Sequence, residues 1–372
     1  MTALASVRRR NTWVALAAGV VALALVPVAV VVAGTAITSS SAAVNVGEVS
    51  VLEIPPTPVG LLSTVDGTGA LTAVTAFALA PSGSGGTVVS VPVGARVRST
   101  GYDPDDMSAV GGVRLADVYA AEGSDAYHRE VSSLLNASLA FDDVLSLDLA
   151  TSMLEASGLA PGAVASVMAV GRTEAQVAEM ERWAALGAAW GELVAGYNAG
   201  SATVSGAVGE PAVAEPDDLA SLIEALFSGP VAYHQLAINP VLSSEGNPNG
   251  LDLYDVDRGE VVLVMASVAP SAVVAANPSV AVQVDSRFDF EVTKRAVSSL
   301  LFVGANVLLV RQVAEPAATV TQLRTSVRLS TKDVKAFESL FGAIEVIPAE
   351  QRVEGIDVQI RLGTAFAEAE DE

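Results

Sequence analysis

The chain has 372 residues, of which 20 are Lys or Arg and 42 are Asp or Glu, so its formal net charge is −22. With 51% hydrophobic residues it is too apolar for a disordered acidic chain, and it is too acidic for a nucleic-acid clamp, which needs clustered Lys and Arg. Because the sequence contains no Cys, it has no disulfide, thiolate nucleophile or iron–sulfur cluster.

The N-terminal region is typical of a membrane anchor. No charged residue occurs between Asn11 and Ser41, and Trp13 to Ile37 consists mostly of Ala, Val, Leu and Gly. At about 1.5 Å per residue, a helix over residues 13–37 is long enough to cross a hydrocarbon core of about 30 Å. Three arginines precede it at positions 8–10, so the positive-inside rule predicts a single-pass plasma-membrane protein with residues 1–12 in the cytoplasm.

A cleaved signal peptide is the alternative reading of this region, because the small residues Gly34, Thr35 and Ala36 could serve a peptidase. The apolar part of a signal peptide usually spans only about 7–15 residues, which favours an uncleaved anchor. The part that follows carries 17 basic and 42 acidic residues, a formal charge of −25, and is expected to be extracytoplasmic. The anchor makes the membrane an expected partner, whereas the charge of the outward part should repel bilayer head groups and anionic polymers, so no nucleic-acid partner is expected.

Residues 38–60 are rich in Ser, Ala and Pro, as in a stiff tether, and residues 61–268 are predicted to form a first extracytoplasmic domain. Ala70–Leu79 and Thr87–Val93 predict two paired strands joined by a Gly- and Ser-rich loop. A strand is also predicted over Val144–Leu147 and another over Val261–Val268.

Helices are predicted in the same domain from apolar residues at helical spacing. They cover Ser124–Leu139, Leu149–Ala156, Thr173–Asn198 and Leu219–Phe227. Thr173 and Gln176 predict a capping box for the third helix, and Asp217 and Asp218 are placed to cap the fourth. Between these two helices the chain is Gly-, Ser- and Pro-rich, which indicates a mobile insertion.

Residues 269–279 are predicted to be a linker, residues 280–366 a small C-terminal α/β domain and residues 367–372 an acidic tail. The C-terminal domain alternates predicted strands and helices, which is typical of an α/β layer fold. The predicted strands are Val280–Val284, Asn306–Gln312, Gln322–Leu329, Ala343–Ile347 and Ile356–Leu362, and the predicted helices are Glu291–Leu301 and Thr331–Phe341.

The last part of the chain contains two characteristic segments, Phe341-Gly-Ala-Ile-Glu-Val-Ile-Pro348 and Ile356-Asp-Val-Gln-Ile-Arg-Leu-Gly-Thr-Ala-Phe366. They resemble the closing strands of the LytR C-terminal domain, which follows many LytR-CpsA-Psr family domains. In the first domain, Arg114-Leu-Ala-Asp-Val-Tyr-Ala-Ala-Glu-Gly123 and Thr87-Val-Val-Ser-Val-Pro92 resemble two further stretches of the family. The resemblance implies a bacterial cell-envelope protein with an α/β domain like that of the LytR-CpsA-Psr (LCP) family, built around a central sheet.

Catalytic members of that family attach polyprenyl-pyrophosphate-linked glycopolymers to the cell wall, using arginines for the pyrophosphate and carboxylates for Mg²⁺. This sequence has Val93 and Gly94 after Pro92, where the family pattern has Arg and Asp. The family's later Gln-Ala-Leu-x-Tyr-x-Arg-x-Arg motif is not found between Ala160 and Pro240 of this sequence. The Asn-Gly-Thr/Ser-Gly turn that usually follows the first strand of the LytR C-terminal domain is also not found, because residues 284–290 stand in its place. These departures favour a protein that binds rather than catalyses.

The candidate phosphate-binding residues are Arg96, Arg98 and Arg114, since the first two follow the strand end where the family Arg would stand. Asp148 is the candidate Mg²⁺ ligand if the domain is catalytic. Asp103, Asp105 and Asp106 form an acidic loop that could chelate a cation, but no EF-hand spacing follows. His128 and His234, the two histidines, stand in no metal or nucleophile motif and are expected to be ordinary residues.

Three functional hypotheses follow. In the first, the degenerate domain acts in cell-wall glycopolymer attachment or assembly by binding or scaffolding, with a glycopolymer, a polyprenyl lipid or wall-synthesis enzymes as partners. In the second, the protein is an active glycopolymer–peptidoglycan ligase or polyprenyl-pyrophosphatase with a rearranged site. In the third, it is a purely regulatory or structural partner of wall-synthesis enzymes, recruited in the membrane plane. A long apolar tunnel with basic side chains at its mouth would favour lipid binding.

Overall fold

The computed structural model describes residues 50–97, 113–171, 179–201, 216–242, 252–274, 280–325, 329–349 and 351–369. Residues 51–372 belong to one compact unit. The predicted transmembrane helix over residues 13–37 lies outside the described residues, as does the predicted capping box at Thr173. Within the described ranges, no helix combines the length and apolar character needed to cross a bilayer.

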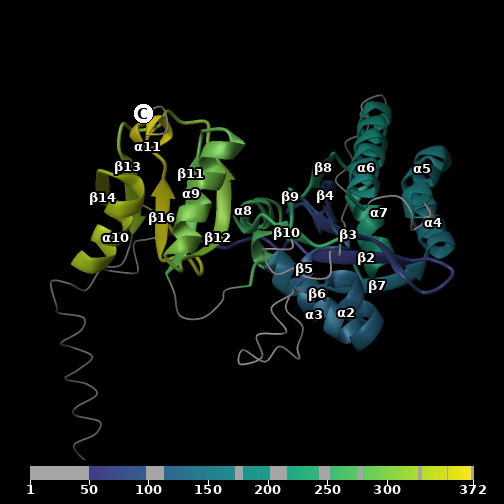
Figure 1. Ribbon diagram of the computed structural model, residues 1–372. Helices are drawn as coiled ribbons and strands as arrows, with labels where there is room; N and C mark the ends of the chain where they lie inside the picture. Colours follow the sequence, from purple (N-terminus) through teal and green to yellow (C-terminus); the bar gives the residue numbers. More distant parts are fainter. Residues whose placement is uncertain are drawn as a thin grey trace, which may run out of the picture. The chain divides into compact units, whose positions relative to one another are not determined.

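Two five-stranded mixed sheets, each packed with helices, make the protein an α/β structure, as predicted (Figure 1). The first sheet has the strand order β7-β2-β3-β4-β8. Its strands are β2 (Val59–Val65), β3 (Leu71–Leu79), β4 (Gly86–Val91), β7 (Phe141–Ser146) and β8 (Val231–Gln235). The predicted hairpin is confirmed, because β3 pairs antiparallel with β4 and Val74 lies opposite Val91. Strand β2, which was not predicted from the sequence, pairs with both β3 and β7.

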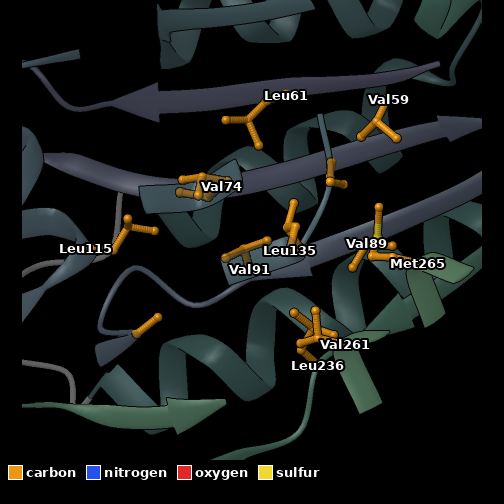
Figure 2. Close-up of a cluster of buried hydrophobic side chains, with 14 of the residues drawn as sticks. Val59, Leu61, Val74, Val89, Val91, Leu115, Leu135, Leu236, Val261 and Met265 are labelled. Carbon is orange, nitrogen blue, oxygen red and sulfur yellow. The ribbon is translucent and has the colours of Figure 1, made fainter. Parts of the chain in front are cut away.

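Helices cover both faces of this sheet (Figure 1). Alternate residues of each strand point to opposite sides, and because apolar residues point to both sides, each face is buried under helices. On one face, Val59, Leu61 and Val89 pack against α2 (Leu115–Glu122), α3 (Ser124–Leu135) and α8 (Arg258–Val268), as Figure 2 shows. On the other face, Leu62 and Phe77 pack against a second helical layer. That layer consists of α4 (Leu147–Ala156), α5 (Pro161–Gly171), α6 (Glu179–Ser201) and α7 (Leu219–Leu226).

Local signals explain several of these helices. Asp218 accepts a hydrogen bond from the backbone N–H of Ser221 at 2.8 Å, so the predicted Asp cap of α7 is confirmed. On α6, Trp190 is almost completely buried against Phe77, with ring centroids 6.0 Å apart. The apolar stripe predicted for this helix therefore forms core where the structure describes it, although Met180 is exposed.

The second sheet has the order β12-β11-β16-β13-β14. Its strands are β11 (Ala281–Ser286), β12 (Asn306–Gln312), β13 (Thr321–Thr325), β14 (Ile344–Pro348) and β16 (Val358–Arg361). Helices α9 (Phe290–Phe302) and α10 (Thr331–Phe341) follow β11 and β13. All five predicted strands and both predicted helices of this region are found, with ends shifted by up to a few residues.

The remaining elements are short. They are β1 (Ser50–Leu52), β5 (Arg96–Val97), β6 (Val113–Arg114), β9 (Ile238–Pro240), β10 (Tyr254–Val256), η3 (Pro270–Ala272), β15 (Gln351–Val353) and α11 (Thr364–Glu368). Thr57 in the predicted tether and Ser271 in the predicted linker hold each other through three hydrogen bonds of 2.7–3.1 Å. These two segments are thus fastened together at that point.

The predicted strand over Val261–Val268 is wrong, because these residues form helix α8. Val261, Val264 and Met265 pack into the core of the first sheet, whereas Val262, Leu263 and Ala266 pack into that of the second. Since α8 is buried on nearly all sides, it has no polar face, and a short apolar run of this kind does not distinguish a helix from a strand. The predicted domain boundaries at 268 and 280 stay predictions.

Candidate functional site

The loop after β4 marks the place where catalytic LytR-CpsA-Psr proteins are expected to carry Arg and Asp. Here Pro92-Val93-Gly94 occupies it, and backbone hydrogen bonds hold it to two other elements. The N–H of Ala116 in α2 donates to the Val93 carbonyl at 3.0 Å, and the N–H of Tyr254 in β10 donates to the Gly94 carbonyl at 2.9 Å. This places β5, β6 and β10 next to one another just beyond the C-terminal end of β4.

Arg96 in β5 forms a two-point ion pair with Asp255 in β10. Its Nε donates to Oδ1 and its Nη2 to Oδ2, each at 2.6 Å. The Arg96 side chain is 34% exposed and that of Asp255 47% exposed. A guanidinium that binds two carboxylate oxygens in this way can bind two phosphate oxygens with the same N–H groups. Asp255 therefore occupies the N–H groups of Arg96 that a phosphate would need.

Arg114 makes an equivalent pair at the start of α2. Its Nε donates to Asp117 Oδ2 at 2.8 Å and its Nη2 to Asp117 Oδ1 at 2.6 Å. The hydrogen bonds from Arg114 lower the pKa of Asp117, so this carboxylate stays charged at neutral pH. Arg96 and Arg114 are register partners across β5 and β6, so the structure brings these two predicted residues together.

The other predicted site residues are not joined to this pair. Arg98 lies outside the described residues, as do Asp103, Asp105 and Asp106. Asp148 is exposed in the first turn of α4, where a carboxylate favours the helix N-terminus. Helix α4 follows β7, which is separated from β4 by β2 and β3.

The described residues do not fit a Mg²⁺ site built on Asp148. Across the part of the chain that the structure describes, no group of three His, Cys, Asp or Glu side chains is placed to share a metal ion. Mg²⁺ prefers several hard oxygen ligands in a near-octahedral arrangement, and an exposed helix-end carboxylate supplies one. The surroundings of Asp148 therefore support no metal-dependent step.

Arg182 on α6 is a further candidate phosphate-binding residue, one that was not predicted from the sequence. It lines a small cavity of about 20 Å³ together with Pro92 and Val93 of the loop after β4. Its Nη2 lies 3.4 Å from the carbonyl oxygen of Thr72, while its buried Nε has no hydrogen-bond partner among the described atoms. In the sequence, Arg182 is a single arginine beside Trp183 in an Ala-rich segment, and no Gln-Ala-Leu-x-Tyr-x-Arg-x-Arg motif surrounds it. Nothing in the sequence therefore indicated that it could bind phosphate.

A larger apolar cavity of about 430 Å³ lies at the opposite end of the central strands, near the start of β2 and the end of β3. Its lining includes Pro56, Pro58, Leu139 and Phe141, and the described residues around it include no Lys or Arg. It thus has the apolar character expected for a lipid chain but not the basic mouth.

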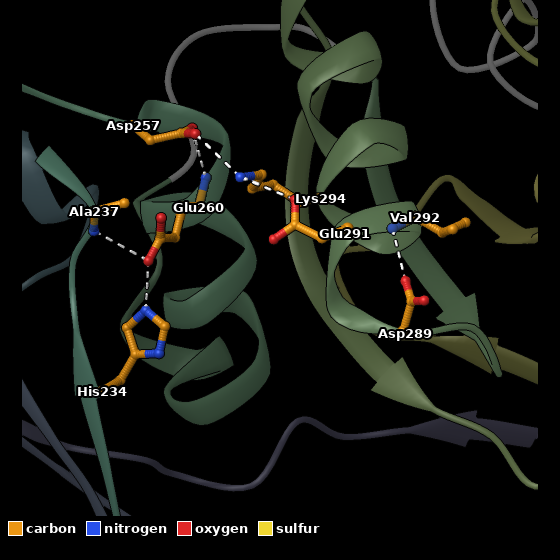
Figure 3. Close-up of polar contacts among 8 residues, drawn as sticks. All are labelled: His234, Ala237, Asp257, Glu260, Asp289, Glu291, Val292 and Lys294. Atoms are coloured by element: carbon orange, nitrogen blue, oxygen red, sulfur yellow. Dashed lines mark hydrogen bonds and ion pairs between the residues drawn. The ribbon is translucent and has the colours of Figure 1, made fainter. Parts of the chain in front are cut away.

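Both histidines are bonded to carboxylates. His128 Nδ1 lies 2.6 Å from Asp142 Oδ2, and His234 Nε2 lies 2.7 Å from Glu260 Oε1 (Figure 3). Glu260 is only 6% exposed and also accepts the N–H of Ala237 at 3.2 Å. These contacts link neighbouring elements of the fold, in keeping with the ordinary role expected for both residues.

Comparison with known proteins gives similarity to solved structures alone: no family model matches this chain, and no curated protein does. B. subtilis TagT aligns at 13% identity over 59% of this chain and 94% of its own, with a TM-score of 0.34. B. subtilis TagV aligns at 11% identity over 56% and 94%, with a TM-score of 0.35. The LytR-CPS2A-psr family protein YwtF (TagT), solved with bound octaprenyl pyrophosphate lipid, aligns at 13% identity over 59% and 93%, with a TM-score of 0.32.

Proposed function

We propose that this protein is a membrane-anchored cell-envelope protein whose first α/β domain acts in wall glycopolymer attachment or assembly by binding or scaffolding, without catalysing the transfer. In this proposal residues 13–37 span the plasma membrane, and the acidic remainder faces outward. Residues 280–366, which carry the second sheet and are called the C-terminal unit below, serve in this proposal as the contact surface for wall-synthesis enzymes or for the glycopolymer.

The two-point pairing of Arg96 with Asp255 is the observation that carries the non-catalytic part of the proposal. A lipid pyrophosphate would have to displace a carboxylate that already satisfies this guanidinium, and Arg114 is engaged by Asp117 in the same way. With Val93 and Gly94 beside them, these arginines lack the strand-end cation and anion of the catalytic pattern. A site neutralised from within has little remaining attraction for a diphosphate.

Crosslinking in intact cells tests the scaffolding role. A photoreactive residue at Val346, which is 45% exposed on β14, is expected to capture envelope proteins or glycopolymer. The same group at Leu149, which is 60% exposed on α4 outside the C-terminal unit, serves as a matched control. Recovery of no envelope component from any exposed position of the C-terminal unit would contradict the proposal.

Arg182 favours a second candidate function, an active ligase or pyrophosphatase with a rearranged site. Its guanidinium lies beside Pro92 and Val93 and could replace the missing strand-end arginine. This candidate predicts release of phosphate from octaprenyl pyrophosphate when the full-length protein is incubated with Mg²⁺ in detergent. Arg182→Ala should abolish that release, whereas Arg352→Ala, on the short strand β15, should leave it unchanged.

A further inference from the structure

A cavity of about 500 Å³ lies between β8 and α8 on one side and the start of α9 on the other. Tyr233 and His234 contribute from β8, Ser267 from α8, and Gln312 from the end of β12. Phe288, Asp289 and Phe290 close it from the C-terminal unit. It is separate from the Arg96 and Arg182 region, because none of its lining residues belongs to β5, β6, β10 or α6.

Aromatic rings supply much of this lining. Phe290 is 41% exposed, although it is a large apolar residue, and its ring centroid lies 5.9 Å from that of His234. The hydroxyl of Tyr233 is bonded to Ser90, and burial raises the pKa of Tyr233 to about 12, so this ring stays neutral. The exposed part of the Phe290 ring can pack against the C–H face of a sugar.

Three polar side chains of the cavity, Asp289, Gln312 and Ser267, offer hydrogen-bond acceptors. Asp289 Oδ1 accepts the N–H of Val292 at 3.0 Å, and an ionised carboxylate has capacity for further donors (Figure 3). Gln312 Nε2 donates to the Phe288 carbonyl at 3.2 Å, and the Ser267 hydroxyl donates to the Leu263 carbonyl at 2.7 Å. A ligand that matches this set must itself donate hydrogen bonds, as sugar hydroxyls do.

Charge narrows the ligand class further. Among the described residues, the lining contains the carboxylate of Asp289 but no Lys or Arg, and the His234 ring is bonded at 2.7 Å to the buried carboxylate of Glu260. A phosphate-bearing unit would meet this negative charge without a cation to compensate it. Neutral sugars carry donors and apolar faces without that cost.

We propose that this cavity binds a neutral saccharide unit, stacked on Phe290 and hydrogen-bonded to Asp289 and Gln312. The proposal rests on the proposed function only for the source of the sugar, a neutral portion of a wall glycan. The site itself follows from its lining, and its occupation requires neither lipid pyrophosphate nor catalysis.

Titration of the full-length protein in detergent with the trimer of N-acetylglucosamine tests the site. We expect saturable binding that Phe290→Ala weakens about tenfold, a typical effect of losing a stacked ring. Phe302→Ala is the matched control: Phe302 is 90% exposed at the other end of the same helix, and its loss should leave affinity within about twofold. Asp289→Asn keeps a good helix cap and should weaken binding severalfold.

Two results would overturn the saccharide site. One is no binding by a folded wild-type protein to this trimer or to an N-acetylglucosamine–mannose disaccharide. The other is binding that Phe290→Ala leaves unchanged, or that tetramethylammonium displaces, which would instead identify a site for an organic cation. Because these titrations contain no pyrophosphate, their outcome is independent of whether the protein scaffolds or catalyses.

Discussion

Arg96 and Asp255 are 159 residues apart in sequence and meet through two hydrogen bonds of 2.6 Å. Asp255 extends from the short strand β10, which reaches the loop after β4 through the bond between Tyr254 and Gly94. The chain thus provides an internal anion for an arginine that, from the sequence, was expected to meet a phosphate.

Asp255→Ala should release Arg96 from this carboxylate and create a measurable affinity for inorganic pyrophosphate, detected by ³¹P NMR. The pair is partly exposed, so the loss of folding stability should be under about 1 kcal/mol. Asp148→Ala is the matched control, because Asp148 is an exposed carboxylate on α4, and it should create no such affinity. Equal pyrophosphate binding by wild type and Asp255→Ala would show that the ion pair does not block the arginine.

The Arg114–Asp117 pair predicts a pH dependence of folding stability. Hydrogen bonds from Arg114 hold the pKa of Asp117 below its ordinary value of 3.8. A lowered folded-state pKa contributes stability that is fully present above the unfolded value and is lost as the pH falls through the folded one. Urea unfolding of wild type and Asp117→Asn should therefore differ at about pH 6. The difference should begin to shrink only as the pH falls below the ordinary value of 3.8, and it should vanish below the lowered folded-state pKa. A difference that grows as the pH falls would contradict this sign.

His234 and Glu260 connect β8 to α8, and the buried carboxylate depends on two donors. Glu260→Ala leaves the N–H of Ala237 and the His234 ring without this acceptor, which should cost about 1–3 kcal/mol in urea unfolding. Lys294→Met is the control, since Lys294 pairs with Asp257 and Glu291 at 3.4 and 3.3 Å nearer the surface, and it should cost under about 1 kcal/mol. Equal costs for the two variants would count against a structural role for Glu260.

Gly259 allows α8 to approach α9 closely. A Cβ at this position would lie 2.1 Å from Ser298 Oγ and 3.3 Å from Ser298 Cβ. Gly259→Ala should lower the melting temperature despite the higher helix propensity of Ala, and adding Ser298→Ala should recover most of the loss. A double variant no more stable than Gly259→Ala alone would show that the strain lies elsewhere.

The C-terminal unit was largely predictable because its signals are local. Asn306–Gln312 and Thr331–Phe341 have the predicted bounds, and the Ser330 cap of α10 forms a complete capping box with Asp333. Helix α8 was not predictable from periodicity, because two cores bury its opposite sides and leave no polar stripe. A Val-rich run of that length fits a strand equally well.

The candidate site was predictable only in part. The Arg96 and Arg114 positions were inferred from their place after a strand and from the family resemblance, and the structure does put them side by side. Their partners depend on long-range pairing: nothing near Asp255 in the sequence indicates that β10 approaches β4. Arg182 was missed for the same reason, since its relation to Pro92 arises from packing of α6 against the sheet.

Equilibrium binding of octaprenyl pyrophosphate to the full-length protein in detergent tests the central claim most directly. The claim is that Asp255 neutralises Arg96 and that Asp117 neutralises Arg114. It predicts that wild type and the Arg96→Ala, Arg114→Ala double variant bind the lipid with the same affinity, whatever the apolar contribution. Tight binding by wild type that the double variant loses would contradict it.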